Sequence, residues 1–376
     1  MEKIALLPEL VAAPAVFAVG KSYQIMALVN RDTLFYVQIG DQVFYDHTNG
    51  VMRTLGRVRS VTVPMSLLDA KGAYTVFCRQ MLDRKPYFPE TGELHSATYP
   101  FRAVPQNAPV RIYQLADTHG GFEAPAAAAS YFGEAPDLLV LNGDIPDHSG
   151  NMENFALIYH LADAVVNGQR PVVFSRGNHD MRGYFAENIT AFSPTDHGNS
   201  YFTFRVGGLW GMVLDCGEDK PDEHDAYGNT NVGHHFRMSQ TAFIKRVIEN
   251  AATEYNALGV THRMVIAHNP FTCIHPAPFD IEQDIYAEWA ELLAAHVKPH
   301  ALLAGHMHYC EIKPQGGELD KAHAIPVIIG SRPKRNEEKK IVSFVGTALT
   351  LTEKTIEVAF TDERGEVLDT GILPVK

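Results

Sequence analysis

The stretch VRIYQLADTH, Val110 to His119, begins as an apolar strand and ends on two residues with metal-binding side chains, Asp117 and His119. Four further apolar runs also end in Asp, Asn or His. They are LLVLNGDIPD at 138–147, PVVFSRGNHD at 171–180, RMVIAHNP at 263–270 and ALLAGHMH at 301–308. In layered α/β proteins, functional residues gather at the carboxyl ends of strands. One such end could be a helix cap or a turn, but five of them indicate a shared site.

The segments around these strands predict an α/β layered domain. Helical periodicity is found at Pro125 to Phe132, Asn151 to Val166, Ser239 to Ala257 and Ile281 to His296. Strands that alternate with helices are typical of a sheet covered by helices. The tail from Ile341 to Leu373 returns to strands. We therefore expect mixed β-sheets.

The first hundred residues have a different sequence pattern. Between residues 22 and 104, short runs rich in β-branched and aromatic residues alternate with turn residues, which predicts a small all-β sandwich. Tyr74 stands where a tyrosine corner could form. Pro100 to Pro109 has the composition of a linker. We expect two domains, an N-terminal β-sandwich at 1–106 and a catalytic domain at 107–376.

Composition limits the classes of function. The formal net charge of -12 argues against a protein that grips a nucleic-acid backbone, but metal ions could still hold a phosphate substrate. The four cysteines form no CxxC pair, and small buried hydrophobes are their expected role. The apolar stretch Ala5 to Gly20 is interrupted by Pro8, Glu9 and Pro14, and no run approaches the roughly 20 apolar residues of a membrane span. These features predict a cytoplasmic protein without a membrane partner.

The candidate ligands form a coherent chemical set of two carboxylates, one amide oxygen and four imidazoles. They are Asp117, His119, Asp144, Asn178, His268, His306 and His308. Oxygen and nitrogen donors without a thiolate suit Mn, Fe or Zn. Seven donors exceed the needs of one tetrahedral ion, and a shared carboxylate would hold two ions roughly 3.5 to 4 Å apart. We predict two divalent or di/trivalent metal ions.

The order of these blocks resembles the calcineurin-like metallophosphoesterase signature across residues 110–310. The matching blocks are Asp117-x-His119, Gly143-Asp144-x-x-Asp147, Gly177-Asn178-His179-Asp180, His268 and Gly305-His306-x-His308. The resemblance implies a sandwich of two mixed β-sheets flanked by helices. It also implies hydrolysis of a small phosphorylated substrate by a metal-bridging hydroxide.

The same resemblance implies a role for each residue. One ion would be bound by Asp117, His119, Asp144 and His308, and the other by Asp144, Asn178, His268 and His306. His179 would contact the phosphate or protonate the leaving group, oriented by Asp147. The chain departs from two subfamilies. The segment 145–148 has no Tyr, which purple acid phosphatases use as an iron ligand, and His148 stands where protein serine/threonine phosphatases have Arg.

Several alternatives remain open from the sequence. The chain could be a non-catalytic scaffold or a nuclease, and phosphomonoesterase and phosphodiesterase activity are not distinguished. A homo-oligomer also stays open. Arg182 and Arg205 are candidate phosphate contacts. The insertion with Glu218 and Asp219, which leads to His234 and His235, could be a lid or a solvated loop.

Overall fold

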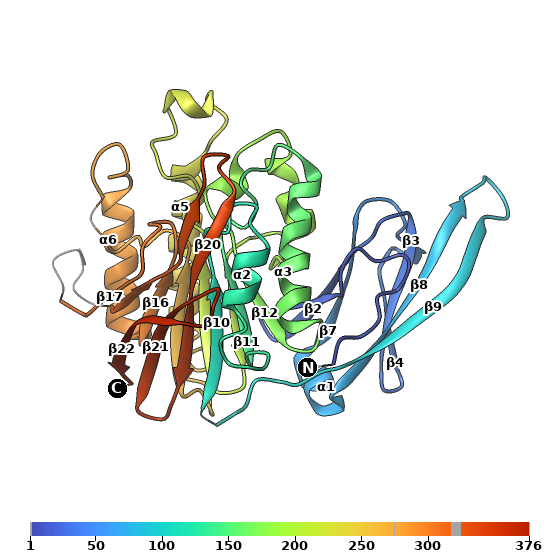
Figure 1. Cartoon of the computed structure of the whole chain (residues 1–376), viewed down its shortest axis with the longest axis horizontal. Helices are drawn as coiled ribbons and strands as arrows, with labels where there is room; N and C mark the ends of the chain where they lie inside the picture. The colour runs from blue at the N-terminus through green and yellow to red at the C-terminus, as the bar shows by residue number, and fades with distance from the viewer. Residues whose placement is uncertain (1, 108, 274, 317–324, 376) are drawn as a thin grey trace.

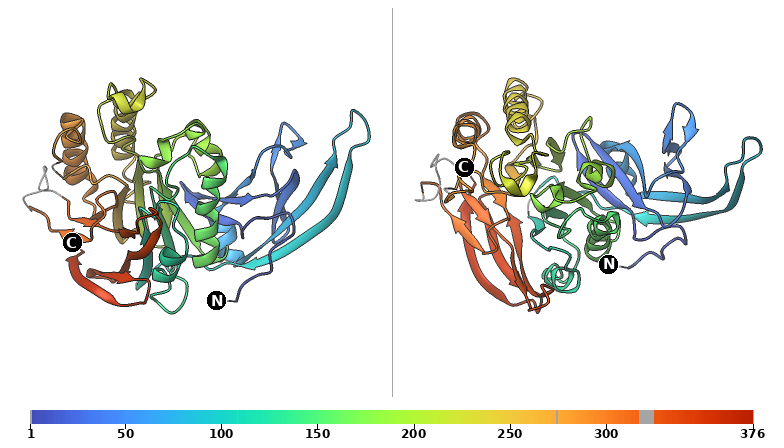
Figure 2. Two further views of the ribbon diagram at one scale, coloured as in Figure 1. Left: turned by 45° about the horizontal axis from the view of Figure 1, so that its top comes forward. Right: turned by 90° about the horizontal axis from the view of Figure 1, so that it is seen from above.

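Two mixed β-sheets face each other, and helices cover their outer faces (Figures 1 and 2). The computed structural model describes residues 2–107, 109–273, 275–316 and 325–375. Three hydrophobic cores match these layers: one joins the two sheets, and one lies under the helices on each side. The predicted fold class is confirmed.

The larger sheet has ten strands and carries three of the five strand ends. In spatial order its strands are β22 (Val367–Pro374), β21 (Thr355–Asp362), β20 (Ile341–Leu351), β10 (Val110–Leu115), β11 (Leu138–Asn142), β12 (Pro171–Ser175), β1 (Ala15–Val19), β2 (Ser22–Leu28) and β7 (Val58–Pro64), and β19 (Arg332–Arg335) pairs with β20. Strands β10, β11 and β12 are parallel neighbours. Their carboxyl ends therefore meet at one edge.

The second sheet carries the other two strand ends. Its strands are β13 (Phe202–Val206), β14 (Leu209–Leu214), β15 (His262–Ala267), β16 (Ala301–Ala304), β18 (Val327–Ile329) and β17 (Glu311–Lys313), in that order. Strands β14, β15, β16 and β18 are parallel. The hydrogen bonds from the Gln114 amide to the carbonyls of Ala304 and Gly330, both 3.0 Å, join the two sheets just below the site.

The outer layers are helical. Helices α2 (Glu123–Ala128) and α3 (Ala156–Val166) cover the large sheet, and α5 (Gly233–Glu249) and α6 (Gln283–Leu292) cover the other. Helix α5 begins six residues before the predicted start. The Asp222 carboxylate accepts hydrogen bonds from the backbone N–H groups of Gly233 and His234, at 2.9 and 3.1 Å. A cap supplied from a distant residue leaves no local start signal.

The N-terminal region is all-β apart from the short helix α1 (Met65–Lys71). Its own sheet contains β4 (Gln42–Tyr45), β3 (Thr33–Ile39), β8 (Ala73–Asp83) and β9 (Glu90–Pro100), and a small hairpin is made of β5 (His47–Thr48) and β6 (Val51–Met52). The facing layer of this sandwich consists of β1, β2 and β7, which belong to the ten-stranded sheet.

The two predicted domains thus share a sheet, because β1 pairs in parallel with β12. The boundary at residue 106 stays a prediction. Tyr74 does not form the expected corner within its own sheet: its hydroxyl donates to the carbonyl oxygen of Gly168, 2.9 Å away beyond α3. Among the described residues, no helix has the length and apolarity needed to cross a membrane.

Candidate metal centre

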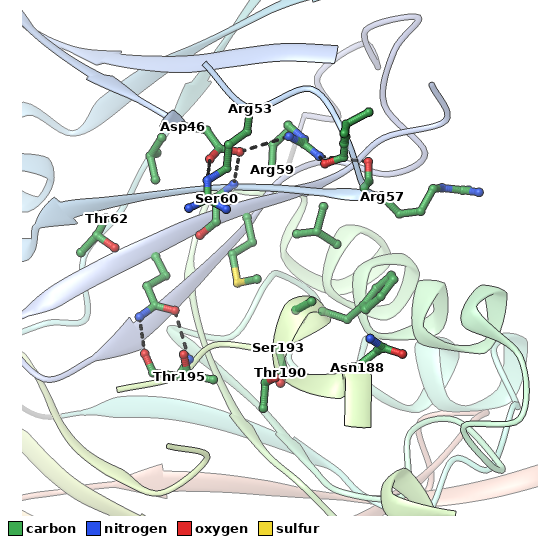
Figure 3. Close-up of a pocket in the computed structure, with 18 of the residues that line it drawn as sticks. Asp46, Arg53, Arg57, Arg59, Ser60, Thr62, Asn188, Thr190, Ser193 and Thr195 are labelled. Atoms are coloured by element: carbon green, nitrogen blue, oxygen red, sulfur yellow. Dashed lines mark hydrogen bonds and ion pairs between the residues drawn. The ribbon is translucent and has the colours of Figure 1, made fainter. Parts of the chain in front are cut away.

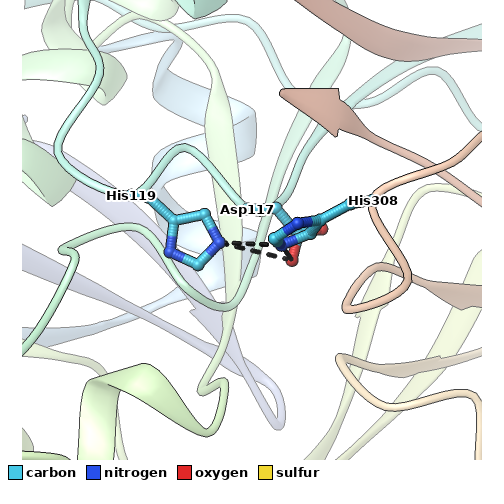
Figure 4. A group of neighbouring side chains, drawn as sticks. All are labelled: Asp117, His119 and His308. Carbon is cyan, nitrogen blue, oxygen red and sulfur yellow. Dashed lines mark hydrogen bonds and ion pairs between the residues drawn. The ribbon is translucent and has the colours of Figure 1, made fainter. Parts of the chain in front are cut away.

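The ends of five strands bring all seven predicted ligands into one cluster. Two groups of three have donor atoms within 4.8 Å of one another: Asp117 with His119 and His308, and Asp144 with His268 and His306. Figure 4 shows the first group, in which the Nε2 atoms of His119 and His308 lie 2.9 Å apart. The seventh residue, Asn178, joins the second group, because its Oδ1 lies 3.1 Å from His306 Nδ1.

The two groups are continuous with each other. His268 Nε2 lies 3.2 Å from Asp144 Oδ2 and 3.6 Å from Asp117 Oδ1. His119 Nε2 lies 3.9 Å from both carboxylates. Both carboxylates therefore stand between the two sets of imidazoles.

The backbone at the cluster is held in an uncommon conformation. Asp117, His119, Asp144, His306 and His308 all have positive φ, between 43° and 69°. Non-glycine residues rarely adopt the left-handed region, and such strain persists where the surrounding structure fixes it, often at functional sites. Five of the seven candidate ligands share this feature, which supports a functional role for the cluster.

Glycines allow the strand ends to approach closely. A Cβ at Gly177 would lie 2.3 Å from Asp144 Oδ1, and a Cβ at Gly143 would lie 2.6 Å from the His268 ring. Neither position tolerates a side chain without movement of a candidate ligand. This close contact explains why glycine precedes Asp144 and Asn178 in the sequence.

Buried opposite charges set the electrostatics of the cluster. Burial acts to lower the pKa of His268, but the attraction of Asp144 and Asp117 outweighs it and raises the pKa to about 10. Burial and the neighbouring His268 lower the pKa of His306 to about 4. Burial acts to raise the pKa of Asp144, yet His268 and the other nearby imidazoles keep it below its usual value.

The donor geometry fits a bound cation. His268 Nδ1 lies 2.7 Å from the carbonyl oxygen of Asn142, which fixes the ring and assigns the proton to Nδ1. Its buried Nε2 has no hydrogen-bond partner among the described residues and points at the two carboxylates. Carboxylate, amide and imidazole donors that converge in this way suit Mn, Fe or Zn.

His179 lies at the edge of the cluster, and the nearby contacts of Asp147 differ from the expected ones. His179 Nδ1 lies 2.8 Å from the backbone carbonyl oxygen of Asp147, not from its carboxylate. The Asp147 carboxylate lies 3.4 Å from His119 Nδ1 and 2.9 Å from Arg335 Nη2. The carboxylate thus faces a candidate ligand, while the Asp147 backbone orients His179.

Sequence reasoning missed two acidic residues beside the cluster. Asp219 Oδ2 lies 3.4 Å from Asn178 Nδ2 and 4.0 Å from His306 Nε2, and Glu218 forms an ion pair with Arg182. Both acids are buried. The sequence contains a sign of them, because they follow β14, a sixth apolar strand that ends in polar residues. A run of charged residues, however, usually indicates a solvated loop.

The other residues that the sequence singles out lie in different parts of the structure. Arg182 reaches the cluster, with its Nη1 3.0 Å from His179 Nε2. Arg205 pairs across from Trp210, at the amino end of β14, and donates to the Leu258 carbonyl, so it lies away from the site. His148 is exposed, and His234 lies 3.0 Å from Glu282.

A separate cavity of about 580 Å³ lies between the β2–β7 edge of the large sheet and residues 188–195 (Figure 3). Its lining includes Arg53, Arg57 and Asp46, but none of the candidate ligands. It is distinct from the metal centre.

Comparisons with known proteins agree with this fold. A family model described as calcineurin-like phosphoesterase matches residues 110–310. A purple acid phosphatase, PPD1, from yellow lupin seeds is similar in structure, with a TM-score of 0.60 at 11% identity over 96% of this chain and 74% of that one. PhoD is also similar, with a TM-score of 0.53 at 11% identity over 99% of this chain and 90% of that one. A comparison with curated proteins returned no match.

Proposed function

The chain belongs to the calcineurin-like phosphoesterase family, and from this premise we propose that it hydrolyses phosphate esters with two metal ions. The observation that carries the proposal is the pair of ligand groups around Asp117 and Asp144. Asp117, His119, Asp144 and His308 would hold one ion, and Asp144, Asn178, His268 and His306 the other. When bound, the ions supply Lewis acidity and lower the pKa of a bound water.

Two further residues, His179 and Asp180, have different roles in the proposed site. His179 is held by the Asp147 carbonyl through Nδ1, so its Nε2 faces the cluster, 3.9 Å from Asp144 Oδ2. With Nδ1 on a carbonyl oxygen and Nε2 facing the Arg182 guanidinium, the ring presents Nε2 as an acceptor, so it can take up a proton near the phosphoryl group. Asp180 braces the site: its buried carboxylate accepts hydrogen bonds from the backbone N–H groups of Gly177 and Asp144, at 2.7 and 3.2 Å.

A metal-reconstituted activity panel tests this proposal. Apo protein loaded with Mn, Fe or Zn is assayed on p-nitrophenyl phosphate, bis-p-nitrophenyl phosphate, cyclic nucleotides, phospholipid headgroup esters and single-stranded oligonucleotides. We expect about two ions per chain and turnover of a small ester. His179→Ala should keep both ions and lose on the order of 10²-fold in rate.

One outcome would contradict the proposal, and two others would change its details. Fully loaded protein that turns over no ester would support a non-catalytic scaffold. Turnover restricted to oligonucleotides would support a nuclease. Full activity of His179→Ala would remove that residue from the mechanism while leaving the metal centre intact.

A further inference from the structure

A rigid loop after β14 places two carboxylates beside the metal centre. Arg237 is buried, and its guanidinium donates to the backbone carbonyls of Cys216 and Glu218 at 2.8 and 2.5 Å. The Gln240 side chain accepts a hydrogen bond from the Asp215 N–H and donates to its carbonyl. The loop backbone is therefore fixed from beneath by α5.

The two carboxylates of this loop, Glu218 and Asp219, bind one edge of the Arg182 guanidinium. Nε lies 3.0 Å from Glu218 Oε1, and Nη2 lies 2.9 Å from Glu218 Oε2 and 3.2 Å from Asp219 Oδ1. The Tyr227 hydroxyl lies 3.0 Å from both carboxylates and braces them. Such a side-on bidentate pair fixes the plane of a guanidinium, which a lysine ammonium cannot reproduce.

The third nitrogen of the guanidinium, Nη1, faces the active site. The hydrogen bonds to the carboxylates come from Nε and Nη2, and Nη1 lies 3.0 Å from His179 Nε2. A charged donor and the candidate proton-transfer group are thus in direct contact at the edge of the cluster. On its other side Arg182 lines a cavity of about 780 Å³, together with Tyr184, Lys220 and Tyr227.

We propose that Arg182 binds the substrate's phosphoryl group directly, that Glu218, Asp219 and Tyr227 are positioning residues for it, and that the preferred substrates are phosphomonoesters. This inference rests on the proposed phosphoesterase function. A monoester dianion keeps three non-bridging oxygens, whereas a diester keeps two and carries one charge less. A fixed guanidinium that is not needed to hold the metals therefore stabilises a monoester more strongly.

The test compares two substrates across a set of variants. The values of kcat/KM for p-nitrophenyl phosphate and bis-p-nitrophenyl phosphate are measured for wild type, Arg182→Ala, Arg182→Lys, Glu218→Gln and Tyr227→Phe. Arg205→Ala is the matched control, because Arg205 lies away from the site. The affinity for inorganic phosphate is measured by calorimetry on the metal-loaded proteins. Metal content and thermal midpoint are recorded for each.

We expect Arg182→Ala to lose about 10²-fold in kcat/KM for the monoester and less than about 5-fold for the diester, and to bind phosphate more weakly. Arg182→Lys should not restore the wild-type ratio of monoester to diester kcat/KM. Glu218→Gln and Tyr227→Phe should shift the ratio in the same direction by smaller amounts, with metal content unchanged. If Glu218→Gln does not fold, Tyr227→Phe supplies the test of positioning.

The inference would be overturned if an active, metal-loaded Arg182→Ala variant lost kcat/KM equally on both substrates, or kept the wild-type ratio of monoester to diester kcat/KM. The phosphoesterase proposal would still stand. A wild-type preference for the diester would do the same. If wild type turns over no ester at all, the phosphoesterase proposal fails separately. Phosphate binding then decides the role of Arg182, and an Arg182→Ala variant with wild-type phosphate affinity would refute it.

Discussion

At the scale of the residue, Asp147 shows how the structure refines a role taken from a motif. The sequence predicts that Asp147 orients His179, yet the contact runs through its backbone carbonyl. The nearby His119 ring and the charge of Arg335 keep the pKa of the Asp147 carboxyl well below its usual value. A carboxylate on the far nitrogen of a metal-binding histidine orients the ring and increases its basicity.

This contact predicts a metal-binding phenotype for Asp147→Asn. We expect the affinity for the ion proposed at Asp117, His119 and His308 to fall about 10- to 100-fold, while the second ion is retained. Metal titration of the apo protein measures both affinities. Glu153→Gln is the control, because Glu153 is an exposed carboxylate that lines the same surface cavity as Asp147. Wild-type metal affinities with a reduced rate would instead favour a role through His179.

At the same scale, the sequence indicates the candidate ligands more directly than the residues that contact them. The seven candidate ligands follow apolar strands, and that pattern is visible without a structure. Glu218 and Arg335 reach the site from a charged loop and from β19, and each is paired with a residue far away in the chain. No local spacing encodes such pairs, because they depend on how the two sheets face each other.

At the scale of the element, a single histidine joins the two sheets at the end opposite the metal centre. His262, the first residue of β15, is buried and lies 2.9 Å, through Nε2, from the carbonyl oxygen of Thr352, just after β20. Burial lowers the pKa of His262, opposed only in part by that hydrogen bond. The folded state therefore favours the neutral ring.

This shift predicts a loss of stability in acid. Above the unfolded-state pKa of about 6.5 the ring is neutral in both states, so its full contribution is present. As the pH falls below that value, the unfolded chain binds a proton that the folded protein resists, and the free energy of unfolding decreases. Urea unfolding of metal-free protein at pH 7.5 and 5.5 should show a smaller decrease for His262→Gln than for wild type. His235→Gln, exposed on α5, is the control, and an equal decrease in all three would contradict the prediction.

At the scale of the whole molecule, the sequence predicts two separate domains. That prediction depends on which strands pair with each other across long stretches of the chain. The strand rhythm of residues 22–104 and the prolines near residue 105 indicate a separate sandwich, and the all-β character is confirmed. The partners of its strands are not encoded locally. Phe17 pairs with Val172 and Val16 with Pro171, across more than 150 residues of chain, so β1 lies between β12 and β2 in the large sheet.

We therefore predict that the two regions fold as one cooperative unit. A fragment of residues 107–376 would expose the edge of β12 and the buried face against which Tyr74 and β1 pack, so it should be insoluble or lack a cooperative transition. In the full chain, both tryptophans, Trp210 and Trp289, report on the catalytic region, whereas far-UV circular dichroism reports on both regions. The two signals should follow one urea transition. Separate midpoints, or a soluble fragment that binds metal and unfolds cooperatively, would show that the boundary near residue 106 divides two independent domains.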